Sequence, residues 1–334
     1  MLDVRADFPF LDANPGLAFL DSAASSQRPR VVIDAIARFD ATTHANVHRG
    51  AYHLSQVATE AYEAARSTVA AFIGATDAAE VAFTRGTTSG LNLVAAGLTP
   101  RLGEGRSVVV TEMEHHANLI PWQVAARTAG AELRAVRMGD DHRLSKDSLD
   151  ETIDATTVVV AVTGMSNVLG TRPDLDDVVA RARAVGALVV VDGAQLVPHH
   201  PVDVAAIGAD ALAFGAHKML GPTGVGALWM RRDLGESIEP WETGGEMIRD
   251  VTLTDATWAD LPQKFEAGTP PITQAIGFAT ALDYLTKLGM GAVADHEDAL
   301  TRLAFERLTG VTFVPGAYPA EPRINAALAG LDID

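Results

Sequence analysis

The stretch "ALVVVDGAQ", residues 187–195, is an apolar run rich in β-branched residues that ends in an acid, a glycine and a glutamine. A run this short that is apolar at every position is typical of a strand buried on both faces of a parallel sheet. Amphipathic segments separate this run from others like it, so the sequence predicts an α/β fold with a mainly parallel sheet flanked by helices. The other runs are "EVAFT" (80–84), "SVVVTEM" (107–113), "TTVVVAVTGM" (156–165), "ADALAFGAHK" (209–218) and "VGALWM" (225–230).

Composition is that of an ordinary globular protein and excludes several classes of partner. The 334 residues suffice for about two domains, and 48% of them are hydrophobic. A net charge of −17 leaves no concentrated basic surface for a nucleic acid. No apolar stretch is long enough to span a bilayer, and "MLDVRADFPFLDANPG" at the amino terminus lacks the apolar core of a secretory signal. We therefore expect a cytoplasmic protein without a membrane partner.

Cysteine is absent from the sequence. Its absence removes disulfides, thiolate metal sites and a cysteine nucleophile at once. The segment "EHHAN" (114–118) also lacks the spacing of a zinc-binding helix, so we expect no metal site.

Polar residues follow the predicted strands at the point where each strand ends. In a sheet of this kind functional groups gather at the carboxyl ends of the strands. Because five strands deliver such groups to one edge, the pattern indicates a ligand pocket rather than five unrelated polar loops. The residues are Thr87 and Thr88, His115 and His116, Ser166 and Asn167, Asp192 and Gln195, and His217 and Lys218.

Lys218 stands at the end of an apolar strand and is followed by three glycines and a proline in "HKMLGPTGVG" (217–226). Lysine is rarely buried. One interpretation is a surface turn between two strands. The other is an amine held in a cleft, where burial lowers its pKa and lets it form an imine with a carbonyl cofactor.

The other candidates each have a structural and a functional interpretation. Asp192 either caps the next turn or pairs with a protonated heterocycle. Thr87 and Thr88 either cap a helix or, with its backbone N–H groups, bind a phosphate. His115 is either structural or stacks on an aromatic cofactor. Taken together, a phosphate site, a stacking ring, a carboxylate and an imine-forming lysine describe a pyridoxal 5′-phosphate site.

The sequence resembles the class V aminotransferase family, and within it the group II branch of cysteine desulfurases and selenocysteine lyases. The resemblance extends over roughly residues 4–310. Its motifs are "VRADFP", "FLDSAASSQRP", "VHRGAYHLS", "FTRGTTSGLNLVA", "MEHHANLIPWQ", "SNVLGT", "VDGAQLVPHHPVDV", "AHKMLGPTGVG", "TGGEMI" and "FEAGTP".

The resemblance implies a PLP-dependent transferase of fold type I, a small amino-acid substrate and a role for each candidate residue. Lys218 would hold the cofactor as an imine and later move the Cα proton, while His115 would stack on the ring. Asp192 would pair with the ring nitrogen and Gln195 with the ring hydroxyl. The remaining cofactor contacts would come from Thr87, Thr88, Asn167, His217 and, across a homodimer interface, Thr269.

Two departures from the family pattern stand out. Gly215 in "FGAHK" occupies a position where the family usually has a phosphate-binding serine, which should weaken cofactor binding by about 1 kcal/mol. Relatives of this branch also carry a small C-terminal domain with the nucleophilic cysteine and an arginine that binds the substrate carboxylate. Neither is found before Asp334, and formation of a persulfide needs a thiolate.

We therefore expect a cysteine desulfurase-like enzyme, converting L-cysteine to L-alanine and sulfur for iron–sulfur cluster assembly, that is incomplete or impaired as given. A sulfur-acceptor protein is a candidate partner. Two alternatives stay open. One is a selenocysteine lyase, β-lyase or epimerase in which Arg49 or another arginine binds the carboxylate; the other is a non-catalytic paralogue. The expected domains are an N-terminal arm (1–25), a large cofactor-binding domain (26–270), and helices with the start of a truncated small domain (271–334).

Overall fold

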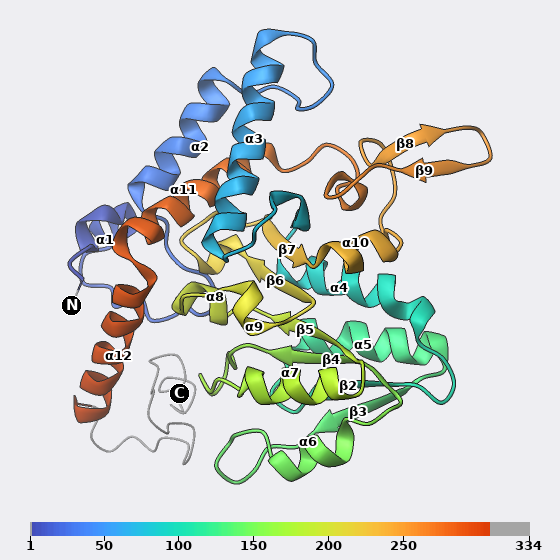
Figure 1. The fold of residues 1–334 in the computed structure, drawn as a ribbon. Coiled ribbons are helices and arrows are strands. Elements are labelled where there is room, and N and C mark those ends of the chain that lie inside the picture. The colour runs from blue at the N-terminus through green and yellow to red at the C-terminus, as the bar shows by residue number, and fades with distance from the viewer. Residues whose placement is uncertain (1, 308–334) are drawn as a thin grey trace.

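Seven strands form one central sheet in this computed structural model, which describes residues 2–307 (Figure 1). The strand order is β1-β7-β6-β5-β4-β2-β3. Neighbouring strands from β3 to β6 are parallel, whereas β7 runs antiparallel to both β6 and β1. The strands are β1 (Val81–Thr84), β2 (Ser107–Thr111), β3 (Glu132–Val136), β4 (Thr157–Thr163), β5 (Leu188–Asp192), β6 (Ala211–Gly215) and β7 (Gly226–Met230).

Helices cover both faces of the sheet, which confirms the predicted α/β class (Figure 1). One face packs on α4 and α5, and the other on α3, α7 and α11. The longer helices are α2 (Arg30–Thr42), α3 (His53–Phe72), α4 (Thr87–Leu98), α5 (His116–Ala129), α7 (Leu175–Ala184), α11 (Ile272–Leu288) and α12 (Met290–Arg307). The short ones are α1 (Pro9–Ala13), α6 (Lys146–Thr152), α8 (Leu196–His199), α9 (Val204–Ile207) and α10 (Arg232–Ser237), with 3₁₀ turns at Arg5–Asp7, Ala78–Glu80, Thr99–Arg101, Ala216–Lys218 and Gln263–Phe265.

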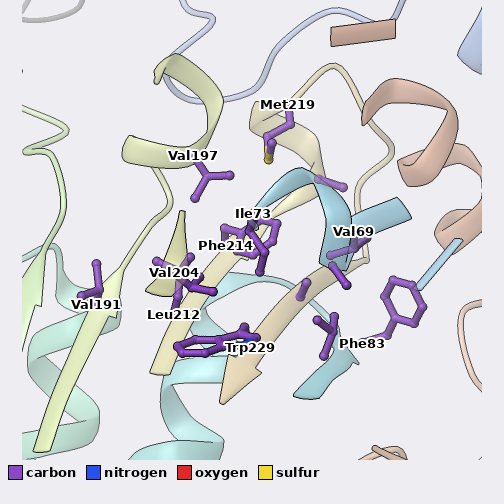
Figure 2. Close-up of a cluster of buried hydrophobic side chains, with 14 of the residues drawn as sticks. Val69, Ile73, Phe83, Val191, Val197, Val204, Leu212, Phe214, Met219 and Trp229 are labelled. Atoms are coloured by element: carbon purple, nitrogen blue, oxygen red, sulfur yellow. The ribbon is translucent and has the colours of Figure 1, made fainter. Parts of the chain in front are cut away.

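The core explains why the strands read as unbroken apolar runs. Successive residues of a strand point to opposite faces, so a sheet covered on both sides must be apolar throughout. In β5, Val189 and Val191 enter the cluster beneath α3 and α11, while Val190 enters the cluster beneath α4 and α5. Figure 2 shows part of the first cluster, in which Phe214 and Met219 lie close to the turn that carries Lys218.

Two elements lie outside the sequence prediction. Strand β3 is at the edge of the sheet, and its sequence "ELRAV" includes an exposed Glu132 and a half-buried Arg134. The hairpin formed by β8 (Ile248–Val251) and β9 (Ala256–Trp258) projects from the body of the molecule (Figure 1). Neither segment is buried on both faces, so neither carries the continuous apolar signal that identified the central strands.

The ends of the described chain meet on the same side of the molecule. Helix α11 packs against α2 and α3, and α12 follows it down that side (Figure 1). The helices predicted within residues 271–334 are thus α11 and α12. The predicted division into an arm, a large domain and a small domain stays a prediction, and residues 308–334 of the predicted small domain lie outside the described residues. Within residues 2–307 no helix is long and apolar enough to cross a membrane.

Candidate functional site

A cavity of about 910 Å³ lies at the edge of the sheet where β1, β2, β4, β5 and β6 end. Strand direction explains the convergence, because all five strands run the same way and only β7 opposes them. Eight of the nine residues that the sequence predicts to contact the cofactor line this cavity: Thr87, Thr88, His115, Asn167, Asp192, Gln195, His217 and Lys218.

The turn from β1 into α4 forms one end of the cavity. Gly86 precedes the helix with φ at +146°, a conformation that side chains other than glycine rarely adopt. Gly226 on β7 packs so closely that a Cβ there would lie 2.6 Å from the Cα of Gly86. No side chain caps the helix, so its first N–H groups stay available, and such groups favour an anion.

The turn after β6 carries His217 and Lys218 and is held by the N-terminal segment of the chain. The carbonyl of His217 accepts hydrogen bonds from the backbone N–H of Ser26 (2.8 Å) and from its hydroxyl (3.0 Å). The hydroxyl oxygen of Ser26 in turn accepts from the backbone N–H of Leu220, at 2.8 Å. Leu220 has φ at +62°, which is unfavourable for this residue type, so these bonds hold a turn that the local sequence would not favour.

Lys218 and Asp192 face the same cavity, and each has a shifted pKa. Burial lowers the pKa of Lys218, and the nearby charge of Asp192 opposes this shift. Burial likewise raises the pKa of Asp192, against the hydrogen bond from Ala194 N–H (2.9 Å) and the charges of Lys218 and His115. Lys218 thus lines the cavity as an amine whose charged form is disfavoured by burial.

His115 is the N-cap residue of α5, where its Nδ1 accepts from the backbone N–H of Ala117 at 3.0 Å. Partial burial lowers the pKa of His115, and this effect exceeds the opposing charge of Asp192. The lowered pKa favours the neutral imidazole at neutral pH, with Nδ1 as the acceptor and Nε2 as the donor. His217 behaves similarly, because burial and the charges of Lys218 and Arg28 lower its pKa.

A chain of hydrogen bonds joins Gln195 to helix α12. Its amide Nε2 donates to the carbonyl of Ala23 at 3.1 Å, and because a carbonyl can only accept, Oε1 must face the other way, toward His199 Nε2 at 3.3 Å. The other ring nitrogen of His199 lies 2.8 Å from a carboxylate oxygen of Glu297. The orientation of Gln195 at the cavity thus depends on residues from three separate parts of the chain.

Four sequence candidates lie elsewhere. His116 and Ser166 line a neighbouring cavity of about 460 Å³ instead. Thr269 is exposed and does not line the cavity of this chain. Arg49, the candidate substitute for a carboxylate-binding arginine, forms an ion pair with Glu246 at 2.7 Å and does not line the cavity either. Among the described residues no group of three or more His, Cys, Asp or Glu side chains could hold a metal ion.

Several residues of the cavity wall were not predicted as site residues. Arg85 follows β1 directly, and the strand-end pattern could have identified it. Asp21, Ala23 and Ala24 come from the N-terminal segment, and Trp241 comes from the loop after α10. The first three lie in the motif "FLDSAASSQRP" (19–29), but no strand-end pattern marks any of the four, because the fold brings them to the sheet edge from a distance.

Comparison with known proteins gives one consistent result. The family model described as aminotransferase class-V matches residues 18–330. A cysteine desulfurase from Haloferax volcanii is 50% identical over 323 residues, covering 92% of this chain and 76% of that protein. A probable cysteine desulfurase from Streptomyces coelicolor is 47% identical over 317 residues, with the same coverage of each chain.

The solved structures that resemble this chain include cysteine desulfurases as well. The apo structure of a cysteine desulfurase from Thermococcus onnurineus superposes with a TM-score of 0.87 at 38% identity, over 91% of this chain and 75% of that one. The cysteine desulfurase CsdA from Escherichia coli gives 0.86 at 36% identity, over 93% and 78% of the respective chains.

Proposed function

The chain belongs to the aminotransferase class-V family, and from this premise we propose that it is a cysteine desulfurase-like enzyme that binds pyridoxal 5′-phosphate (PLP) in the cavity at the sheet edge. The observation that carries the proposal is the placement of Lys218 and Asp192 on one cavity wall, the first with a lowered pKa and the second buried. Had these side chains faced opposite sides of the sheet, no such site could exist.

The residues present fit the cofactor group by group. The uncapped start of α4, with Thr87 and Thr88, suits the phosphate. Asp192 is 2% exposed, and a carboxylate that deep is costly unless a positive partner meets it. A protonated pyridine nitrogen would be that partner. Bound there, the cofactor would supply an electron sink for negative charge developing at the substrate Cα.

Lys218 is the residue that we assign to covalent attachment and proton transfer. An amine attacks an aldehyde only when neutral, and burial lowers the pKa of Lys218 toward that state. Because Lys218 lines the cavity in which substrate would lie, its Nζ would be the group that takes the Cα proton and returns it. The neutral His115 ring would stack on the cofactor, and Gln195 would donate its second amide hydrogen to the ring hydroxyl.

The substrate that we propose is cysteine. Its sulfur must be transferred to a thiol, and these 334 residues contain none. Cysteine and an acceptor thiol RSH then give alanine and the persulfide RSSH, so that the C–S bond breaks and an S–S bond forms. We further propose that a sulfur-acceptor protein supplies the thiol for iron–sulfur assembly. A β-lyase, the alternative that needs no thiol, would instead consume water and release pyruvate, ammonia and hydrogen sulfide.

A second copy of the chain is part of the proposal. Thr269 is exposed, and the segment before it is fixed to the sheet through Glu266, whose carboxylate binds Arg66 and the N–H of Phe83. This anchoring supports a fixed position for Thr269, from which it would reach the phosphate bound by the partner. The cytoplasmic location expected from the sequence stays a prediction.

The test is reconstitution with PLP. We expect the purified protein to turn yellow and Lys218→Ala to lose the visible band. The matched control is Lys264→Arg, since Lys264 is also buried with a pKa lowered by burial but donates to the carbonyls of Gly235 and Glu236 instead. The control should stay yellow. With cysteine and an added thiol, alanine should form; a colourless wild type, or pyruvate in place of alanine, would contradict the proposal.

A further inference from the structure

Glu114 is a half-buried acid that does not line the cofactor cavity but lines a second cavity of about 460 Å³, which shares His115 and Asn167 with the first. Its carboxyl group is in contact with two strand ends and a helix. Oε1 lies 2.9 Å from the backbone N–H of Thr163 at the end of β4 and 2.7 Å from the hydroxyl of Thr111 at the end of β2. Oε2 accepts from the side-chain amide of Asn118 on α5 at 2.6 Å.

Trp122, which hydrogen-bonds to Asn118, fixes which groups donate and which accept in the hydrogen bonds of Glu114. The indole N–H of Trp122 can only donate, and it donates to Oδ1 of Asn118 at 3.1 Å. The Nδ2 group of Asn118 must therefore face Glu114 as a donor. The N–H of Thr163 is a donor as well, so residue 114 has to accept on both oxygens. The hydroxyl of Thr111 can rotate to accept, so a protonated Glu114 fits the same pattern.

This network connects the corner that carries His115 to the strand end beside Asp192. His115 is the next residue in the chain, and its carbonyl accepts from the backbone N–H of Asn118 at 2.8 Å. Thr163 is the register partner of Asp192 across β4 and β5. Asn118 and Trp122 are fully buried, so no solvent can replace the hydrogen bond between them if it is lost.

We propose that Glu114 is a positioning residue, whose two accepting oxygens hold the His115 ring at a fixed place relative to Asp192. The inference rests on the proposed PLP site, because it assigns to Glu114 the geometry in which His115 meets the cofactor ring. Burial raises the pKa of Glu114 to about 8, so placing this carboxyl group here costs free energy. Its two accepting oxygens are what the site gains in return.

The test replaces one accepting oxygen of residue 114 by a donating amide, and then restores a matching acceptor at residue 118. In Glu114→Gln one amide hydrogen must face a donor, either Asn118 Nδ2 or Thr163 N–H. The double variant Glu114→Gln with Asn118→Asp restores a match, since the new carboxylate accepts from both Trp122 and the glutamine. We expect Glu114→Gln to weaken PLP binding, measured by absorbance titration, by at least about fivefold, and the double variant to recover to within about twofold of wild type.

Two readouts separate positioning from plain stability. In a His115→Ala background, Glu114→Gln should change PLP affinity by less than about twofold, because the residue through which it acts is missing. In the protein without PLP, the NMR resonances of the His115 ring, assigned by their absence in His115→Ala, should shift in Glu114→Gln and return in the double variant. If Glu114→Gln fails to fold, wild type and double variant are compared alone, and their His115 resonances must agree.

An equal loss of PLP affinity with and without His115, or unchanged His115 resonances in Glu114→Gln, would overturn the inference. A wild type that binds no PLP would instead refute the proposed function, and the resonances would still decide the role of Glu114.

Discussion

Replacing Glu266 by glutamine should destabilise the protein strongly, because this carboxylate is the centre of a buried network. Its oxygens accept from both terminal nitrogens of Arg66 (2.5 and 3.0 Å), from the Tyr62 hydroxyl (2.9 Å) and from Phe83 N–H (2.7 Å). Arg66 is 1% exposed, and its guanidinium also lies over the rings of Tyr62 and Phe83.

The magnitude follows from burial. Removing one partner of a buried ion pair costs about 3–5 kcal/mol, since the other charge stays buried without compensation. In Glu266→Gln the amide nitrogen must also face a donor where an oxygen accepted before. Glu63 offers a matched control: it binds the same arginine through Nε at 2.9 Å, but its side chain is 39% exposed. Exposed pairs contribute about 0–1 kcal/mol, and we expect Glu63→Gln to lose no more than that.

Urea unfolding followed by circular dichroism measures both variants against wild type. We expect Glu266→Gln to lower the free energy of unfolding by about 3–5 kcal/mol, and Glu63→Gln to stay close to wild type. Equal losses in the two variants, or a Glu266→Gln loss below about 1 kcal/mol, would refute the argument from burial.

Three further results are expected. Gly215→Ser should tighten PLP binding about fivefold relative to Gly215→Ala in absorbance titration, since a Cβ there lies 3.2 Å from Thr87 Oγ1 and the serine adds a phosphate-facing hydroxyl; equal affinities would contradict this. Asp192→Asn should still bind PLP but lower kcat with cysteine, because a neutral amide cannot stabilise a charged ring nitrogen; full activity would exclude that role. Because burial raises the pKa of Glu114 from 4.5 to about 8, the folded state holds the extra proton, so the unfolding free energy should fall with rising pH across that window by up to about 1.4 kcal/mol per pH unit. Glu114→Gln should lack this part of the slope in urea titrations at several pH values.

The central strands and the site edge could be predicted from sequence for one physical reason. A strand buried on both faces must be apolar at every position, so "TVVVAVT" in β4 and "LVVVD" in β5 are recognisable without neighbours. Once the strands are parallel, the residues after them must converge, and that geometry placed Asp192 and Lys218 in one cavity.

The remaining features depend on contacts that no local pattern contains. The partner of Arg66 is Glu266, 200 residues away, and the local sequence around either residue does not indicate the pair. Trp241 reaches the cavity only because the loop after α10 folds back over it. Strand β3 escaped prediction because an edge strand keeps polar residues on its open side.

The hydrogen bonds of Ser26 to the turn at Lys218 affect the order in which the site forms during synthesis. The two hydrogen-bonded residues are separated by 191 positions, so the beginning of the chain leaves the ribosome long before its counterpart exists. Closing so long a loop is slow compared with forming local helices. The cofactor pocket should consequently mature as one of the last steps of folding, and a fusion or deletion that disturbs residues 21–26 should yield folded but colourless protein.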